Sequence, residues 1–204
     1  MGIDGIDIGS LASLGIPDLR VVTENGEVIG VRGQCLACRK NRWHFDAVLG
    51  AGVSTIIDLR TGDYRNDLLF LCEKNGIGYY HIPIDKKHTP AHEIISRLPL
   101  LIEALSCRNF YISCTQGLHR TDTALALHFM FNPKAVDPPL MYGHVIGGRF
   151  KSGEVYGRVG SVFHSLTEED KAMLGWDEAF EAGFSERKSV LSAAQEQLIN
   201  PAQI

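Results

Sequence analysis

The alternation of short apolar runs with helical segments restricts the fold of this chain more than any other feature. Three runs typical of buried strands cover residues 54–59, 78–82 and 109–113, and segments of helical periodicity separate them. Strands joined through helices form right-handed crossovers, so they pair in parallel within one sheet that has helices on both faces. The sequence therefore predicts an α/β fold with a central, mostly parallel sheet flanked by helices.

Other elements are expected before and between these strands. Two short strands, 19–23 and 27–31, flank Asn25-Gly26, a dipeptide that favours a tight hairpin turn. The helical segments expected along the core are residues 43–49, 64–74, 94–105 and 121–131. Arg60 follows a strand end and is expected to form a salt bridge there, with phosphate contact as the alternative.

The last third of the chain is predicted to be a helical extension. It begins with a glycine-rich stretch, 143–160, and then becomes helical, with Thr167 as an N-cap. A final helix is expected over 185–199, with an inward face made of Val190, Leu191, Ala194 and Leu198. The 204 residues, 45% of them hydrophobic, suit one domain over 1–204, with a core at about 28–131 and the extension over about 140–204.

Charge and hydropathy exclude several classes of partner. The net charge of -4 and the pI of about 6.0 give no overall attraction to nucleic acid or to an anionic membrane. No apolar run reaches the roughly 18 residues of a membrane span, and Asp4 and Asp7 stand where a secretory signal carries cations. We expect a cytoplasmic protein that recognises anions through one local pocket; the sequence sets no oligomeric state.

The five cysteines form an odd set without a dense disulfide framework. Cys35 and Cys38 make a single C-x-x-C pair with no second pair at ligand spacing, so no metal and no cofactor are expected. Cys72 and Cys107 lie within or at the end of helical patterns and are expected to be small buried hydrophobes. Cys114 differs from the others because of the residues that follow it.

The segment from Cys114 to Thr121 carries the chemistry. It joins a predicted strand to a predicted helix and places Arg120 six residues after the cysteine. With five cysteines and twelve arginines, chance gives this spacing about 0.3 times per chain. Requiring Gly117 and Thr121 as well lowers that figure to roughly 0.003.

The residue types in this loop suit the binding of a phosphate. A tight loop at a helix N-terminus directs several backbone N–H groups and the positive end of the helix dipole at one anion. Gly117 permits the sharp backbone conformation, and the planar fork of Arg120 can hold two phosphoryl oxygens. The same field favours the thiolate form of Cys114, and Thr121 is placed to donate a hydrogen bond to that sulfur. The phosphate-binding residues expected from this pattern are Thr115, Gln116, Gly117, Leu118, His119 and Arg120.

This loop resembles that of the cysteine-based protein tyrosine and dual-specificity phosphatases. The segments 52–60 and 76–85 resemble the strands and the acid loop of small dual-specificity members, so the likeness covers about 28–131. It implies a phosphotyrosine phosphatase-like fold and hydrolysis of phosphate monoesters through a phosphocysteine intermediate. Asp85 is the match to the residue that protonates the leaving oxygen, with His88 as the alternative. The implied partner is a phosphorylated protein or small molecule.

The sequence departs from the family pattern at three positions. Ser113 replaces a histidine, Lys86 occupies the usual slot of the acid, and Asp122 replaces a glycine with a charge that is expected to oppose a bound dianion. A phosphate-binding pseudophosphatase therefore stays open as an alternative. Phosphatases of phosphoinositides or small metabolites also stay open, although no lysine lies within 115–119. A rhodanese-like sulfur carrier fits less well, because the arginine spacing does not match.

Overall fold

A five-stranded sheet lies at the centre of the computed structural model, which describes residues 5–24, 26–36, 42–61, 65–84, 89–115, 119–132, 145–146, 149–150 and 153–199. The strands are β1 (Arg20–Glu24), β2 (Glu27–Gln34), β3 (Thr55–Asp58), β4 (Gly78–His81) and β5 (Phe110–Cys114). They lie in the order β1-β2-β5-β3-β4. The β1–β2 hairpin is antiparallel and the other three pairs are parallel, which confirms the predicted sheet.

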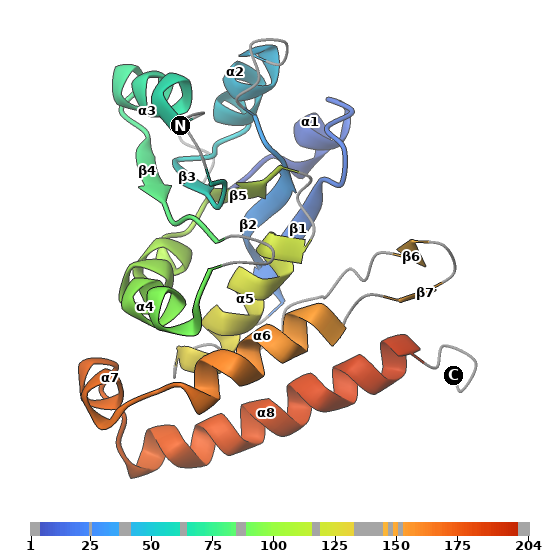
Figure 1. Ribbon diagram of the computed structural model, residues 1–204. Coiled ribbons are helices and arrows are strands. Elements are labelled where there is room, and N and C mark those ends of the chain that lie inside the picture. Colours follow the sequence, from blue (N-terminus) through green and yellow to red (C-terminus); the bar gives the residue numbers. More distant parts are fainter. Residues whose placement is uncertain are drawn as a thin grey trace.

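Helices cover both faces of the sheet (Figure 1). One face carries α1 (Ile8–Ala12), α2 (Arg42–Gly50) and α3 (Arg65–Lys74). The other carries α4 (Ala91–Ser106) and α5 (His119–Phe131). Beyond α5 lie α6 (Gly153–His164), α7 (Glu168–Met173) and α8 (Glu178–Ile199), while β6 (Val145–Ile146) and β7 (Arg149–Phe150) form a separate small ribbon.

The central strands are apolar on both faces because both faces are covered. Ile56 and Tyr111 belong to the core under α2 and α3, whereas Ile57 and Ile112 belong to the core under α4 and α5. Side chains alternate between the faces of a strand, so β3 and β5 are buried at every position, and apolar residues lie on both of their faces. This is the physical reason for the continuous runs in the sequence.

The C-terminal helices differ from the prediction. Helix α6 starts at Gly153, inside the stretch expected to be irregular, because Val155, Val159 and Val162 lie on one helical face and are buried. This packing outweighs the low helix propensity of glycine. Helix α8 begins at Glu178 rather than at 185, and the structure also adds α1, which was not expected.

The inward face of α8 was predicted correctly only in part. Leu191 is buried, but Val190 is 39% exposed, so its inward placement was wrong. The side chains of Ala194 and Leu198 lie outside the described part of the chain. The buried residues of this face recur at helical spacing and are Phe180, Phe184, Arg187 and Leu191.

Two predicted helix boundaries are confirmed. Thr167 caps α7 through a capping box with Asp170, in which each residue bonds to the backbone N–H of the other. After α3 the chain turns at Gly76, whose φ of 65° is a left-handed conformation that glycine adopts without strain. The turn at Gly26, with φ of 75°, joins β1 to β2, while Asn25 lies outside the described residues.

Candidate active site

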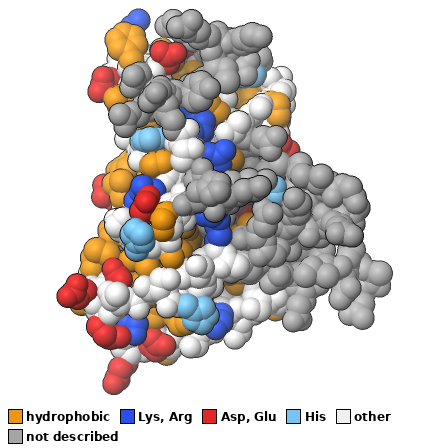
Figure 2. All heavy atoms as spheres, viewed as in Figure 1, with side chains coloured by type: hydrophobic (Ala, Val, Ile, Leu, Met, Phe, Trp, Pro, Cys, Tyr) orange, Lys and Arg blue, Asp and Glu red, His pale blue; other side chains and the backbone are white. Residues whose placement is uncertain are grey.

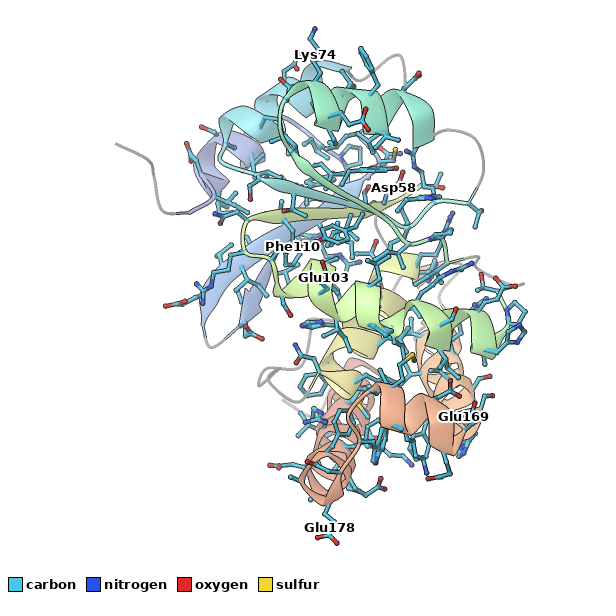
Figure 3. The ribbon with its side chains drawn as sticks, turned by 90° about the vertical axis from the view of Figure 1, so that its left-hand side faces the viewer. Asp58, Lys74, Glu103, Phe110, Glu169 and Glu178 are labelled. Atoms are coloured by element: carbon cyan, nitrogen blue, oxygen red, sulfur yellow. The ribbon has the colours of Figure 1, made fainter. Side chains whose placement is uncertain are left out.

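Cys114 is the last residue of β5, at the carboxyl edge of the sheet. In the parallel register its neighbour on β2 is Gln34, and the preceding Ser113 pairs with Asp58 of β3. Figure 3 shows Asp58 at this carboxyl edge, away from the edge where Phe110 begins β5. Sites in sheets of this kind form at the carboxyl ends of the strands, so the fold places Cys114 where the sequence predicted it. Its side chain is 3% exposed.

Arg120 lies in the first turn of α5 and reaches back across the loop. Its Nη2 donates a hydrogen bond to Thr115 Oγ1 at 2.8 Å. The two ends of the loop are thus brought together by the arginine. Gln116, Gly117 and Leu118 lie outside the described residues. His119 is the first residue of α5, and its carbonyl accepts a hydrogen bond from Thr123 Oγ1 at 2.9 Å.

The hydroxyl groups next to the loop are buried. Thr121 is inaccessible, and its Oγ1 has no hydrogen-bond partner among the residues that the structure describes. Ser113 Oγ, at the position before Cys114, is in the same state within that part of the chain. Most buried hydroxyls in proteins are hydrogen-bonded. Thr121 and Ser113 therefore keep hydrogen-bonding capacity on either side of the loop.

A buried ion pair fixes the start of α5 to the sheet. Arg32 on β2 donates from Nη1 to Asp122 Oδ1, and the side chains are 1% and 4% exposed. The expectation that Asp122 opposes a bound dianion is therefore corrected, because an arginine directly against it compensates its charge. Sequence reasoning did not single out Arg32. The available signal was a cation directly after the apolar residues Ile29 and Val31 of one strand and an acid inside the apolar sequence of α5.

A second buried pair lies at the same edge of the sheet. The guanidinium of Arg60 bonds to both carboxylate oxygens of Asp58, at 2.8 Å from Nε and 2.7 Å from Nη2, and Tyr79 Oη adds a bond of 3.3 Å. Burial alone lowers the pKa of Arg60, but the hydrogen bonds and charge of Asp58 outweigh it and raise this pKa above its ordinary value. The predicted salt bridge of Arg60 is confirmed.

Lys and Arg side chains gather in the middle of the face on which α5 begins (Figure 2). This local cationic surface contrasts with the net charge of -4 for the whole chain. Recognition of anions through one local pocket stays a prediction.

Asp85 and His88, the candidate acids, lie outside the described residues, as does Lys86. The segment that follows β4 is described as far as Ile84, and its backbone hydrogen bonds continue the pattern of the sheet beyond the ends of the strands. Leu59 N donates to Ser113 O at 2.9 Å, and Ile84 N donates to Leu59 O at 3.2 Å. The segments that lead to Cys114 and to Asp85 thus lie two chain spacings apart, about 10 Å.

The remaining expectations concern metals, membranes and cysteines. Among the described residues, no cluster of His, Cys, Asp and Glu side chains is arranged to hold a metal, and no helix is long and apolar enough to cross a membrane.

Cys35 is buried, whereas Cys38 lies outside the described part of the chain. Cys72 is fully buried as expected, but Cys107 is only half-buried, so that part of the expectation was wrong.

A buried cysteine at the end of a central parallel strand, followed by a loop closed by an arginine on the next helix, defines a cysteine-dependent phosphatase of the tyrosine and dual-specificity type. A family profile described as "DSP-PTPase phosphatase fused to NAD+ Kinase" matches residues 17–137, more than half of the chain. The chain belongs to this family and is a phosphatase.

A solved structure of a phosphatase shares this fold. Kinase associated phosphatase, solved with a serine in place of its catalytic cysteine, is 16% identical; the match covers 80% of this chain and 99% of that one, with a TM-score of 0.52. A putative phosphatase of the DUF442 group from Shewanella putrefaciens is 14% identical over 90% and 98% of the two chains, with a TM-score of 0.49. At 16% identity the likeness to kinase associated phosphatase shows the fold alone. No curated protein sequence matches this chain.

Proposed function

We propose that Cys114 is the nucleophile and Arg120 the phosphate-binding cation of this phosphatase. The thiolate of Cys114 attacks phosphorus, the bond from phosphorus to the ester oxygen breaks, and a phosphocysteine forms. Arg120 holds two phosphoryl oxygens through its planar fork and exchanges its bond to Thr115 Oγ1 for these contacts. The observation that supports this assignment best is that single hydrogen bond, which closes the loop from Cys114 to Arg120.

Proton transfer is assigned to Asp85, and stabilisation of the leaving sulfur is assigned to Thr121. Asp85 gives its proton to the leaving oxygen, and in the second step its carboxylate takes a proton from the attacking water, which releases inorganic phosphate and restores the thiolate. The Thr121 hydroxyl donates a hydrogen bond to the departing sulfur and keeps its proton. Two findings support these roles: the segment before Asp85 lies next to the loop after β3, and Thr121 Oγ1 has no other partner among the described residues.

The proposed substrate is a phosphate monoester on a protein, with phosphotyrosine first and phosphoserine or phosphothreonine next. The loop residues 115–119 contain no lysine, so the pocket has fewer cations than the several phosphates of an inositol lipid require. The proposed location is the cytoplasm, which is supported by the need of a free thiol nucleophile for a reducing compartment.

A phosphorylated small metabolite is the second candidate. The matching family joins phosphatase domains of this kind to NAD+ kinase, an enzyme whose product carries a phosphate monoester on a dinucleotide. NADP+ is therefore the metabolite to include in an assay.

The test measures phosphate release from four substrates: a phosphotyrosine peptide, a phosphoserine peptide, an inositol phospholipid and NADP+. The expected result is fastest release from the phosphotyrosine peptide, abolished by Cys114→Ser and strongly reduced by Arg120→Lys. Preferred turnover of NADP+ would select the metabolite instead. Binding of the peptide without release from any substrate would identify a pseudophosphatase.

A further inference from the structure

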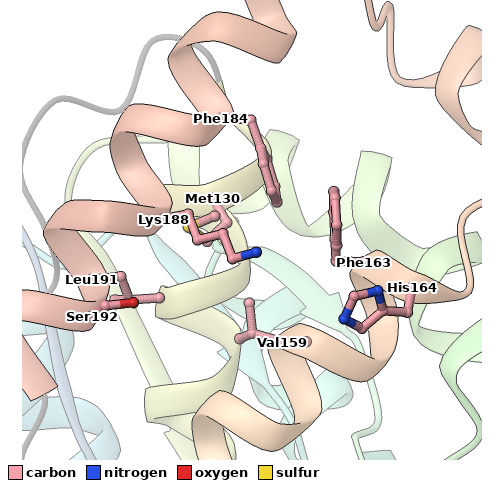
Figure 4. Close-up of a pocket in the computed structure, with 9 residues that line it drawn as sticks. Met130, Val159, Phe163, His164, Phe184, Lys188, Leu191 and Ser192 are labelled. Atoms are coloured by element: carbon pink, nitrogen blue, oxygen red, sulfur yellow. The ribbon is translucent and has the colours of Figure 1, made fainter.

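A pocket between α5, α6 and α8 lies away from the proposed phosphate-binding loop (Figure 4). It has a volume of about 150 Å³. Met130, which lines it from α5, is ten residues after Arg120 on the same helix. A helix rises 1.5 Å per residue, so the pocket and the loop lie about 15 Å apart along α5. A ligand can therefore occupy the pocket without entering the loop.

The floor of the pocket is apolar. It is made of Met130, Val159, Phe184 and Leu191, none of which is more than 6% exposed. Phe163 stacks on Phe184 with ring centroids 4.7 Å apart and an angle of 16° between the planes. Aromatic rings and a thioether make favourable contacts with a further aromatic ring.

The rim of the pocket is polar and cationic. His164, Lys188 and Ser192 lie there and are exposed. The Lys188 Nζ is 5.4 Å from the centroid of the Phe163 ring, and Figure 4 shows it directed into the space between Phe184, Phe163 and Val159.

Among the described residues, no carboxylate forms an ion pair with the ammonium group of Lys188. The residues one turn before and after Lys188 on α8 are Phe184 and Ser192, so neither neighbouring position on its own helix face carries an acid. Lys188 also forms no ion pair within the part of the chain that the structure describes. A concave site with an apolar floor and one unpaired cation complements an anion that has an apolar body.

We infer that this pocket binds a small aromatic carboxylate. The ring lies against Met130, Phe163 and Phe184, and the carboxylate accepts a hydrogen bond from Lys188 at the rim. Apolar cavities of about 150 Å³ hold one benzene ring, so the volume selects a single six-membered ring over a larger ring system. This binding site is additional to the phosphatase activity and does not depend on the assignment of the catalytic residues.

The methyl group of Met130 provides a direct readout of binding. The chain has four methionines, so a protein labelled with ¹³C at the methionine methyl groups gives few signals, which Met130→Leu assigns. Titration with benzoate is expected to shift the Met130 signal in a saturable way, with a Kd on the order of 1 mM. The signal of Met173, which is 51% exposed on α7, is the internal control and should not move.

Two neighbouring glycines of α6 provide a matched pair of variants. Gly160 lines the pocket, and a Cβ there would meet no atom within 4 Å, so Gly160→Leu fills the pocket without a clash in the backbone. Gly157 is equally open but lies outside the pocket, so Gly157→Leu is the control. Phosphate release from an aryl phosphate should be unchanged in both variants, which shows that each is folded.

Benzoate binding should be lost in Gly160→Leu, retained in Gly157→Leu and weakened about tenfold in Lys188→Met, because a charge-assisted hydrogen bond is removed. Benzamide, which has the same shape and no charge, should bind about tenfold more weakly than benzoate to the unaltered protein. An unmoved Met130 signal, equal affinities for benzoate and benzamide, or undiminished binding to folded Gly160→Leu would overturn the inference.

Discussion

The buried pair of Arg32 and Asp122 predicts a large loss of stability when one partner is removed. In Arg32→Met the side chain keeps much of its apolar volume but loses the guanidinium, so the Asp122 carboxylate stays buried without this counter-charge. The two side chains are only 1% and 4% exposed, so solvent screens the interaction little. Breaking such a pair costs about 3–5 kcal/mol. For a chain of this length each kcal/mol lowers Tm by about 2–4 °C, which gives a decrease of about 6–20 °C.

The assay is urea unfolding followed by circular dichroism, with the phosphatase activity measured in parallel. Arg32→Met/Asp122→Leu removes both charges and should regain most of the lost stability, because a buried pair replaced by apolar residues is often neutral. Arg32→Met should also raise KM, since the Asp122 carboxylate in the first turn of α5 then lacks the charge of Arg32 and repels the dianion more strongly, and the double variant should restore it. A loss below about 1 kcal/mol in Arg32→Met, or a double variant no more stable than the single one, would refute the reasoning.

Three further predictions concern stability and reactivity. Burial lowers the pKa of His128 from 6.5 to about 4, so the unfolded chain binds a proton that the folded protein does not. The contribution of this residue to stability is therefore present above pH 6.5 and falls as the pH decreases toward 4. Urea midpoints measured across this range should decrease less in His128→Gln than in the unaltered protein. The same dependence of the midpoint on pH in both proteins would contradict the account. Burial raises the pKa of the Cys72 thiol to about 12, so iodoacetamide at neutral pH should modify Cys107 well before Cys72 in the native protein. Equal labelling of the two cysteines, measured by mass spectrometry, would exclude this difference in reactivity. A Cβ at Gly30 would overlap the Phe110 ring, so Gly30→Ala should lower Tm. A Cβ at Gly50 would meet no atom within 4 Å, so Gly50→Ala should leave Tm nearly unchanged. Similar changes of Tm in the two variants would be inconsistent with this packing.

The parallel sheet could be predicted because both of its faces are covered, so strands such as β3 and β5 are buried at every position and consist mostly of apolar residues. The start of α6 could not, because its glycines signal irregular structure and only the burial of Val155, Val159 and Val162 against neighbouring helices offsets that preference. The start of α6 is therefore determined by tertiary packing rather than by local helix propensity.

The position of the site was predictable from the strand, loop and helix around Cys114, since all three are contiguous in the sequence. The pairing of Arg32 with Asp122 was not, because these residues are 90 positions apart and meet only when β2 lies beside β5. The charge of Asp122 was consequently interpreted as a repulsion, although a buried arginine compensates it. Charge effects at a site depend on the neighbours that the topology supplies.

The central claim is that Cys114 carries the phosphoryl group during turnover. The direct measurement is acid quenching of the enzyme during hydrolysis of an aryl phosphate, followed by digestion and mass spectrometry of the peptide that contains Cys114. Asp85→Asn, which slows the attack of water, should increase the trapped amount. The account predicts one phosphoryl group on Cys114 and none in Cys114→Ser. Continued hydrolysis with the phosphoryl group on another residue, or undiminished turnover by Cys114→Ser, would contradict it.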